Sequence, residues 1–335
     1  RSCVDGLDFG DFRKTAPSDP PGLTEVRRII QDPKDPLHDA VRLFYTCLAI
    51  CHSVQADDVT EELQPGGGGV SMRYSGMSPD EVALVQAAHD AGVVFKKRSR
   101  NNGSGVSTLT ILDPTATEPR TFTLLHELEF NADRKRMSVI VKDETEVWCV
   151  TKGADNVLGG LLDAPLRLEA AEHLSKFSKE GLRTLVVTMK KVEPLYLQTW
   201  QEQLCAAQRL TDAGRNEQVA LIQARMETSL QLVGVTAVED RLQDGVPQAI
   251  ATIKGAGIRL WVLTGDKTET AVDIARSCTL FGATTKLVYA TGAESAEEGR
   301  AKLSQAKQAL QHCQDGGLVL DGMTIGFAFA DSDAP

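Results

Sequence analysis

Along the first two thirds of the chain, apolar residues recur with the spacings of helices and strands. From Asp35 to Val54 they recur every three or four residues, which predicts a helix with Asp35 at its N-cap and Pro36 at its first position. Apolar runs bounded by turn residues then predict a series of strands, and such a series favours an antiparallel sheet. The predicted strands are residues 92–99, 107–112, 121–130, 136–142 and 145–152.

Two polar stretches interrupt this pattern. Residues 1–35 are polar and broken by prolines, which predicts a linker or a strand remnant rather than a helix. Residues 64–71 contain four consecutive glycines and predict a flexible loop, and Asn101–Gly105 predicts the turn of a hairpin.

From residue 230 the pattern changes. Residues 230–238 and 258–263 are nearly continuous apolar runs, as in strands covered on both faces. Each is followed by an amphipathic helix, and this β-α-β-α order predicts a parallel, doubly wound sheet. A polar helix near residues 294–313 and a strand near 317–320 follow. The predicted organisation is therefore a linker (1–35), an antiparallel-sheet domain with flanking helices (36–229) and a parallel α/β domain (230–335).

Composition narrows the possible functions. The net charge of −10 argues against a nucleic-acid partner. No apolar run is long enough to cross a bilayer. Of the seven cysteines, Cys47 and Cys51 alone are close in sequence, and their helical spacing favours core packing over a zinc site, so we predict no metal ligands.

The stretch Thr264-Gly265-Asp266 stands at the predicted carboxyl end of the 258–263 strand, where open parallel sheets bind ligands. Gly265 would let the backbone approach a ligand, and amides at the next helix start could hold phosphate oxygens. Taken alone, the stretch is more typical of a strand-to-helix turn with Asp266 or Thr268 as N-cap. A Walker A loop is excluded, because Asp266 separates Gly265 from Lys267.

Several stretches together resemble the P-type ATPases, and specifically their type IV, phospholipid-flippase branch. They are SPDEVALVQAA from Ser78, LEFNADRKRMSVIV from Leu128, TKGADNVL from Thr151, EGLRTLVV from Glu180, and EDRLQDGVPQAIATIKGAGIRLWVLTGDKTETAVDIA from Glu239. The resemblance covers about residues 36–330. It implies a nucleotide-binding domain followed by part of a haloacid-dehalogenase-like phosphorylation domain.

The resemblance assigns an ATP pocket to four residues. Lys152 would contact the phosphates or adenine, Arg183 would contact the phosphates, and Phe130 would stack on adenine. Their structural alternatives are a solvated lysine, an exposed strand residue and a core phenylalanine. The resemblance places Glu81 at the adenine amino group of the nucleotide. Ser78-Pro79-Asp80-Glu81 also has the form of a helix capping box, so both roles stay open for Glu81. The basic run from Arg134 to Arg136 is typical of a solvated face, or it could attract ATP.

The resemblance also identifies Thr264, Gly265 and Asp266 as the family's second phosphate motif, not as the phosphorylation signature. Asp240 lies in a segment that links the domains near the phosphates, whereas Asp244 is more simply a helix N-cap. The DKTGT signature, the GDGxND motif that holds magnesium and the TGES loop are absent from the sequence. We therefore expect a fragment with no catalytic residue of its own, which binds ATP but does not turn it over.

In the intact protein, the resemblance implies an ATP-driven transporter that moves phospholipid between leaflets from the cytosolic face of a membrane. Mg²⁺ would arrive with ATP, and its protein ligands would lie outside this chain. A small membrane accessory subunit is a further implied partner. Two alternatives stay open: a stand-alone, non-catalytic nucleotide-binding module, and a soluble haloacid-dehalogenase-like phosphatase with its own nucleophilic aspartate.

Overall fold

The computed structural model of this protein divides into two compact units, Arg1–Glu239 and Asp240–Pro335. A nine-stranded sheet belongs to the first unit, and a two-stranded parallel sheet belongs to the second. The structure describes residues 1–5, 7–10, 20–58, 72–100, 106–144, 146–163, 165, 168–180, 182–211, 214–239, 245–265, 268–282, 284–311, 313 and 315–329.

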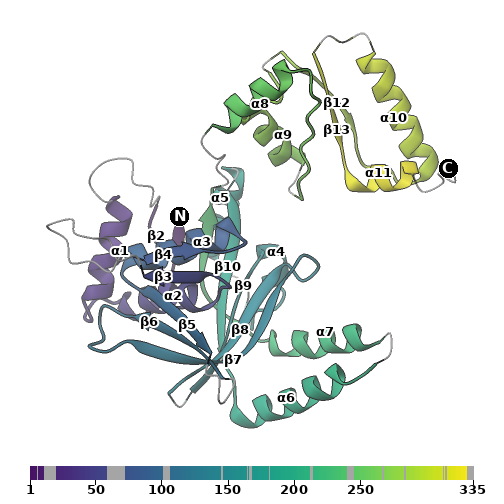
Figure 1. The fold of residues 1–335 in the computed structure, drawn as a ribbon. Coiled ribbons are helices and arrows are strands. Elements are labelled where there is room, and N and C mark those ends of the chain that lie inside the picture. The colour runs from purple at the N-terminus through teal and green to yellow at the C-terminus, as the bar shows by residue number, and fades with distance from the viewer. Residues whose placement is uncertain are drawn as a thin grey trace. The chain divides into compact units, whose positions relative to one another are not determined.

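Unit 1 is built around a sheet in which all neighbouring strands run antiparallel, as predicted (Figure 1). The strand order is β2-β1-β11-β10-β9-β8-β7-β6-β5. A separate antiparallel pair joins β3 (Gln55–Asp58) to β4 (Met72–Ser75). The strands of the large sheet are β1 (Ser2–Val4), β2 (Leu7–Asp8), β5 (Val94–Arg100), β6 (Ser107–Leu112), β7 (Arg120–Asn131), β8 (Arg136–Asp143), β9 (Glu146–Gly153), β10 (Arg183–Lys191) and β11 (Gln231–Val238).

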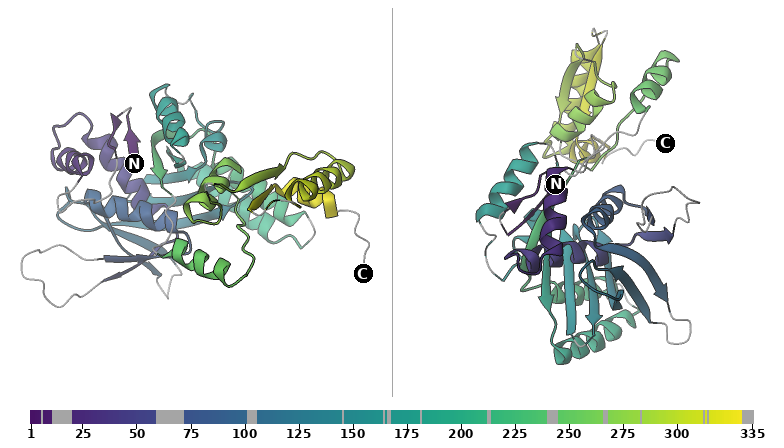
Figure 2. Two further views of the ribbon diagram at one scale, coloured as in Figure 1. Left: turned by 90° about the horizontal axis from the view of Figure 1, so that it is seen from above. Right: turned by 90° about the vertical axis from the view of Figure 1, so that its left-hand side faces the viewer.

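Helices cover both faces of this sheet (Figures 1 and 2). Because side chains alternate along a strand, Val150 of β9 joins the core under α1, α2 and α3, whereas Cys149 joins the core under α6 and α7. On that second face, α4 and α5 cover β10 and β11. The helices are α1 (Pro21–Gln31), α2 (His38–Ile50), α3 (Pro79–Ala91), α4 (Asp155–Leu158), α5 (Leu168–Lys179), α6 (Pro194–Gln208) and α7 (Arg215–Met226).

Helix α1 shows that the prediction of no helix within residues 1–35 is wrong. Pro21 occupies the start of α1, where its missing amide hydrogen is not needed. Leu23, Val26 and Ile30 have no exposed surface, and their spacing is the helical signal that the prolines obscured. The strand-remnant part of the prediction is confirmed by β1, which pairs with β11.

Helix α2 confirms the first predicted helix, although it begins at His38 with Leu37 as N-cap. Asp35 instead accepts the Leu37 amide at 2.9 Å in the turn before the helix. The buried side of α2 carries most of the predicted apolar positions, namely Val41, Phe44, Cys47 and Leu48, and Cys51 lies just beyond the end of the helix.

Strand β11 corrects a second prediction. The sequence predicts that residues 230–238 begin a parallel sheet, but β11 pairs antiparallel with β10 and β1 in unit 1. Residues 234–237 are buried, so burial on both faces is confirmed. A continuous apolar run reports burial and not strand direction, because helices cover both faces of this antiparallel sheet.

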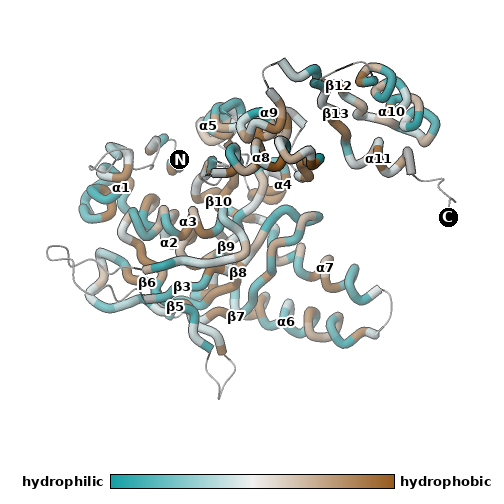
Figure 3. The backbone as a smooth tube through the Cα atoms, turned by 45° about the horizontal axis from the view of Figure 1, so that its top comes forward, coloured by the Kyte–Doolittle hydropathy of each residue, from teal (hydrophilic) through white to brown (hydrophobic). Residues whose placement is uncertain are grey.

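Unit 2 contains two parallel strands connected by a helix. β12 (Lys286–Ala290) pairs with β13 (Gly316–Leu320), and α10 (Ala296–Leu310) connects them in a β-α-β arrangement. The predicted polar helix and final strand are confirmed by α10 and β13, whereas β12 was not predicted. Hydrophilic residues recur along α10, as its polar sequence predicts (Figure 3). The other helices are α8 (Val246–Gly255), α9 (Thr268–Ser277) and α11 (Gly322–Phe329).

Residues 258–263 lack the strand that their apolar sequence predicts. Trp261 is 82% exposed and Leu263 is 89% exposed, and no described strand pairs with this segment. A strand needs a neighbour to satisfy its backbone groups, so β propensity alone leaves this segment irregular.

No two of the seven cysteines are joined by a disulfide. Cys47 on α2 and Cys51 at its C-cap are both part of the hydrophobic core, which confirms packing as their role. Burial raises the pKa of the Cys51 thiol to about 12 and also raises that of Cys47. Cys205 on α6 is exposed. Across the described helices, none has both the length and the apolar composition needed to cross a bilayer.

Candidate functional site

The candidate site forms around the N-terminus of α3. Ser78 is the N-cap and Pro79 the first helical residue, and Ser78 Oγ accepts the Glu81 amide at 3.4 Å. This is one half of the predicted capping box. The Glu81 carboxylate does not return to the cap, because its oxygens contact Ser53 and Lys152. The structure thus shows no capping contact of the Glu81 carboxylate, and its role at the nucleotide stays a prediction.

Lys152 is buried although it is a lysine. It lies near the end of β9 and is only 6% exposed, which excludes a solvated surface residue. Its Nζ lies 2.6 Å from Glu81 Oε1. Burial alone would raise the pKa of Glu81, but the Lys152 charge and hydrogen bonds from Lys152 and Ser53 outweigh it and lower the pKa. Glu81 is therefore ionised at neutral pH.

The segment after α2 holds Glu81 from another side. Ser53 donates to Glu81 Oε2 from its hydroxyl at 2.6 Å and from its amide at 3.1 Å. The preceding His52 accepts the Val54 amide at Nδ1, so its Nε2 donates to the Ala49 carbonyl at 2.8 Å. Burial lowers the pKa of His52 to about 3, so this ring is neutral at physiological pH.

Arg183, the first residue of β10, reaches the same helix N-terminus. Its Nη1 lies 3.2 Å from Oδ2 of Asp80, the second residue of α3. Val186 pairs with Gly153, so Arg183 lies three residues beyond the end of β9. Acidic residues of one helix turn therefore contact both predicted cations, Lys152 and Arg183.

Phe130 lies in the irregular last part of β7, next to the turn into β8. It is 65% exposed, so it is not a core residue. The next residue, Asn131, pairs with Arg136, which pairs with Gly153. Two strand spacings place Phe130 roughly 10 Å from the residue after Lys152. An accessible aromatic side chain thus lies at the same end of the sheet as the buried lysine.

Gly153 lets the β7–β8 turn lie close against β9. A Cβ at this position would be 2.5 Å from Arg136 Cβ and 2.7 Å from the Lys135 carbonyl oxygen. That carbonyl accepts the Ala154 amide at 3.0 Å. Glycine after Lys152 is therefore explained by the close approach of two backbone segments.

Arg134 and Arg136 show that the prediction of a solvated basic face is wrong for these two residues. Both contact the carboxylate of Glu227, whose side chain is fully buried, and their own side chains are 16% and 11% exposed. Lys135 between them is exposed. The two guanidinium groups balance a buried carboxylate and do not form a free basic patch.

The second predicted phosphate site is described only in part. Thr264 and Gly265 are exposed in the irregular segment before α9. A Cβ at Gly265 would have no heavy atom within 4 Å, so its backbone is open to approach. Asp266 and Asp240 lie outside the described residues, as does Asp244, and their roles stay predictions.

One aspartate does follow a parallel strand, where the phosphatase alternative needs a nucleophile. Asp321, directly after β13, accepts the amides of Thr324 and Gly292, which lower its pKa. Its oxygens therefore cap α11. The residue after it is Gly322 and not the Asp or Thr that a phosphatase nucleophile requires, so Asp321 does not favour that alternative.

A cavity of about 640 Å³ opens elsewhere in unit 1. Thr46, Cys47, Trp148 and Met189 contribute to its lining, and none of the predicted site residues does. The candidate site therefore depends on the contacts among its charged residues and not on this cavity.

Sequence reasoning misses several residues that complete the site. Asp80 was within reach, because it belongs to the same motif as Glu81. Ser53 comes from the segment after α2 and carries no motif of its own. Glu227 follows α7, and nothing in its neighbouring sequence distinguishes it from a surface glutamate.

Comparison with known families covers both units. The profile described as P-type ATPase, cytoplasmic domain N, matches residues 40–245. The profile of the haloacid dehalogenase-like hydrolases matches residues 195–317. Glu81, Phe130, Lys152 and Arg183 all lie inside the first match.

Curated relatives match most of the chain. Phospholipid-transporting ATPase FetA of Mus musculus is 41% identical over 252 residues, which are 74% of this chain and 20% of the relative. Phospholipid-transporting ATPase DRS2 of Saccharomyces cerevisiae is 35% identical over 335 residues, 97% of this chain and 23% of the relative. Phospholipid-transporting ATPase IC of Homo sapiens is 38% identical over 311 residues, 86% and 23% respectively. The chain thus spans about a fifth to a quarter of the length of these relatives.

Proposed function

Because the chain belongs to the P-type ATPases, we propose that unit 1 binds ATP for phosphoryl transfer to an aspartate outside this sequence. The observation that carries the proposal is the buried ion pair of Lys152 with Glu81, at the helix N-terminus that also contacts Arg183. Buried and charged groups of this kind are concentrated at functional sites.

The side chains present fit ATP. The exposed ring of Phe130 offers adenine a stacking surface. Lys152 and Arg183 supply cations for phosphate or ring contacts, and the α3 N-terminus favours negative charge. Glu81 would orient Lys152 or accept the adenine amino group. Mg²⁺ would accompany the phosphates of the nucleotide.

For the whole protein we propose the activity that the names of its relatives state, the ATP-driven transport of phospholipid. The lipid, the membrane and an accessory subunit would all be engaged by parts outside this sequence. In that reaction the chain's own residues would position ATP and neutralise its charge, which is most of what phosphoryl transfer requires of a protein.

Calorimetric titration of ATP into the full chain tests the proposal. Lys152→Ala is expected to weaken binding at least tenfold, because a charged contact contributes roughly 1.5–3 kcal/mol. Lys142→Ala is the matched control, because Lys142 is an exposed lysine on the neighbouring β8 and should leave the affinity unchanged.

Lys152→Ala also leaves Glu81 buried without its partner, so a second variant is needed. Glu81→Gln with Lys152→Met removes both charges and keeps the volume, and it should also bind ATP weakly while staying folded by circular dichroism. A folded wild-type chain without saturable ATP binding would refute the proposal, and so would full affinity in both Lys152 variants.

A further inference from the structure

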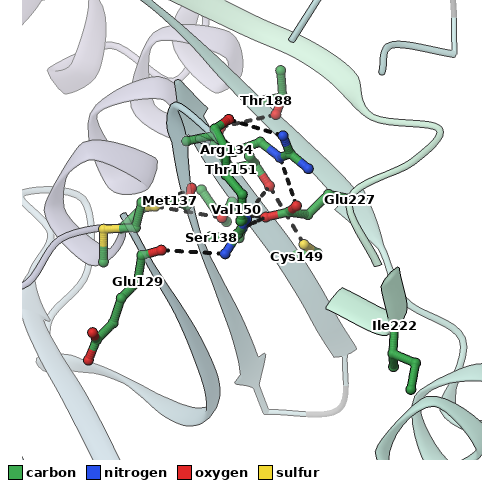
Figure 4. A network of polar contacts seen from close by, with 12 residues as sticks. Glu129, Arg134, Met137, Ser138, Cys149, Val150, Thr151, Thr188, Ile222 and Glu227 are labelled. Atoms are coloured by element: carbon green, nitrogen blue, oxygen red, sulfur yellow. Dashed lines mark hydrogen bonds and ion pairs between the residues drawn. The ribbon is translucent and has the colours of Figure 1, made fainter. Parts of the chain in front are cut away.

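Glu227 is a fully buried carboxylate at the C-cap of α7. Such a group persists in a protein interior only when it is paired and hydrogen-bonded. Glu227 has three partners. Arg134 Nη2 and Ser138 Oγ, the latter at 2.6 Å, are labelled in Figure 4. The third is Arg136 Nε at 2.7 Å. All three belong to β8 or to the turn before it. Glu227 therefore ties the end of α7 to the β7–β8 hairpin.

The hydrogen bonds that leave Glu227 have a defined direction. The Ser138 hydroxyl donates to Oε1 of Glu227, because a carboxylate oxygen accepts. Ser138 Oγ is then left to accept from the Thr151 hydroxyl at 2.8 Å. Thr188 in turn donates to the Thr151 carbonyl at 3.0 Å. The chain of hydrogen bonds (Figure 4) thus reaches from α7 to the residue directly before Lys152.

The arginine partners of Glu227 hold the turn that follows Phe130. Arg134 Nη1 donates to the Glu129 carbonyl at 3.4 Å, and Arg136 Nη1 donates to the Arg134 carbonyl at 3.0 Å. Both guanidinium groups therefore link the buried carboxylate to the backbone around Phe130. Because Phe130 is 65% exposed, this backbone, more than side-chain packing, sets where its ring lies.

From this geometry we infer that Glu227 is a positioning residue of the nucleotide site. It holds the Phe130 turn and the Lys152 end of β9 in one arrangement, and it does so without touching the nucleotide. The inference rests on the proposed ATP binding. It adds α7, which supplies none of the four predicted contacts, to the parts of the fold that determine affinity.

The test is a double-mutant cycle measured by ATP titration of the full chain. Phe130→Ala is expected to weaken binding about tenfold in the wild-type background, from the loss of stacking. Glu227→Gln keeps the shape but leaves two guanidinium groups without their anion, and is expected to weaken binding about tenfold. In the Glu227→Gln background, Phe130→Ala should cost less than about threefold, because the ring is already misplaced.

If Glu227 has a merely structural role, Phe130→Ala will weaken ATP binding by the same factor in both backgrounds. The double variant would then lose affinity by the product of the two single fold-changes, and this result would overturn the inference. Glu217→Gln, an exposed residue of the same helix, is the control and should change neither affinity nor coupling. If Glu227→Gln fails to fold, the same cycle is run with Glu227→Asp, which keeps the charge and shortens the reach. A wild-type chain that does not bind ATP would refute both proposals, whereas normal binding with an uncoupled Glu227 would refute only this one.

Discussion

The two units bury their apolar residues to different extents. In unit 1, three clusters of buried residues include large side chains such as Phe44, Phe95 and Trp200. In the described part of unit 2, the buried apolar residues are small, mainly alanines, with no buried aromatic among them. The segment around Trp261 and Leu263 is exposed although it is as apolar as strands of unit 1. An apolar run therefore becomes core only where neighbouring elements cover it.

The two predicted phosphate-contacting regions also differ in how far neighbouring elements cover them. Lys152 lies on a central strand with partners on both sides, and its charge meets a fixed carboxylate. Thr264 and Gly265 lie in an irregular, exposed segment. A site held by paired strands needs little reorganisation to bind, whereas an irregular segment must lose conformational freedom first.

Two tryptophans provide the largest expected contrast. Trp200 is 2% exposed and donates its Nε1 hydrogen to the Ile222 carbonyl at 2.7 Å. Trp200→Ala should reduce the free energy of unfolding by about 4 kcal/mol. Trp261→Ala should change it by less than about 0.5 kcal/mol. Urea unfolding of the full chain, followed by circular dichroism, measures both, and equal losses would contradict the contrast between the units.

Two glycines give a smaller contrast. Gly153→Ala forces a Cβ within 2.5 Å of Arg136 Cβ, so we expect a loss of about 2 kcal/mol in unfolding free energy and weaker ATP binding. Gly265→Ala meets no atom within 4 Å and should stay within about 0.5 kcal/mol of wild type. Thermal unfolding and ATP titration test the pair. A neutral Gly153→Ala would show that the β7–β8 turn can move away from β9.

Two aspartates give the smallest contrast, which concerns the loss of stability at low pH. Burial opposes ionisation of Asp113, but Arg42 and Thr115 outweigh it and lower its pKa from 3.8 to about 2. A lowered carboxyl pKa contributes stability that is complete above the unfolded value and lost as pH falls through the folded one. The free energy of unfolding should therefore decrease as the pH is lowered from about 4 to about 2. Asp113→Asn should remove about 1 kcal/mol of this decrease, a value reduced because the arginine partners of Asp113 are partly exposed.

The counterpart in unit 2 is Asp321, whose pKa is lowered by the amides of Thr324 and Gly292 at an exposed helix cap. Asp321→Asn should flatten the acid dependence less than Asp113→Asn does. Urea titrations from pH 2 to pH 6 measure both variants. A larger effect for Asp321 would reverse the comparison.

Local sequence signals predict the fold wherever local contacts decide it. The β5–β6 hairpin, the β7–β9 series and α2 follow from periodicity and turn residues. The direction of β11 does not, because it is set by its pairing with β1 and β10, which are distant in sequence. Nor does the irregularity of residues 258–263, which reflects a missing neighbour and not the residues themselves.

The candidate site, too, is predicted from sequence only where local motifs mark its residues. Motifs point to Lys152, Glu81 and Arg183, and the structure brings these three together through α3. Its supporting groups are separated from them in sequence: Glu227 lies 91 residues from Arg136. From sequence alone, a charge run such as Arg134 to Arg136 predicts an exposed surface, because the buried carboxylate of Glu227 that it balances is distant in sequence.

The burial of most thiols has a practical consequence for spectroscopy. Five of the seven cysteines are buried and Cys313 is half-buried, so Cys205 is the thiol most open to a maleimide dye. It lies on α6, which packs against α7. A fluorophore attached there would sit on the helix pair that ends at Glu227, at the opposite end of the hydrogen-bond chain from Lys152. The sequence thus already carries an accessible thiol on the helix pair joined to Glu227, and no new cysteine is needed for labelling there.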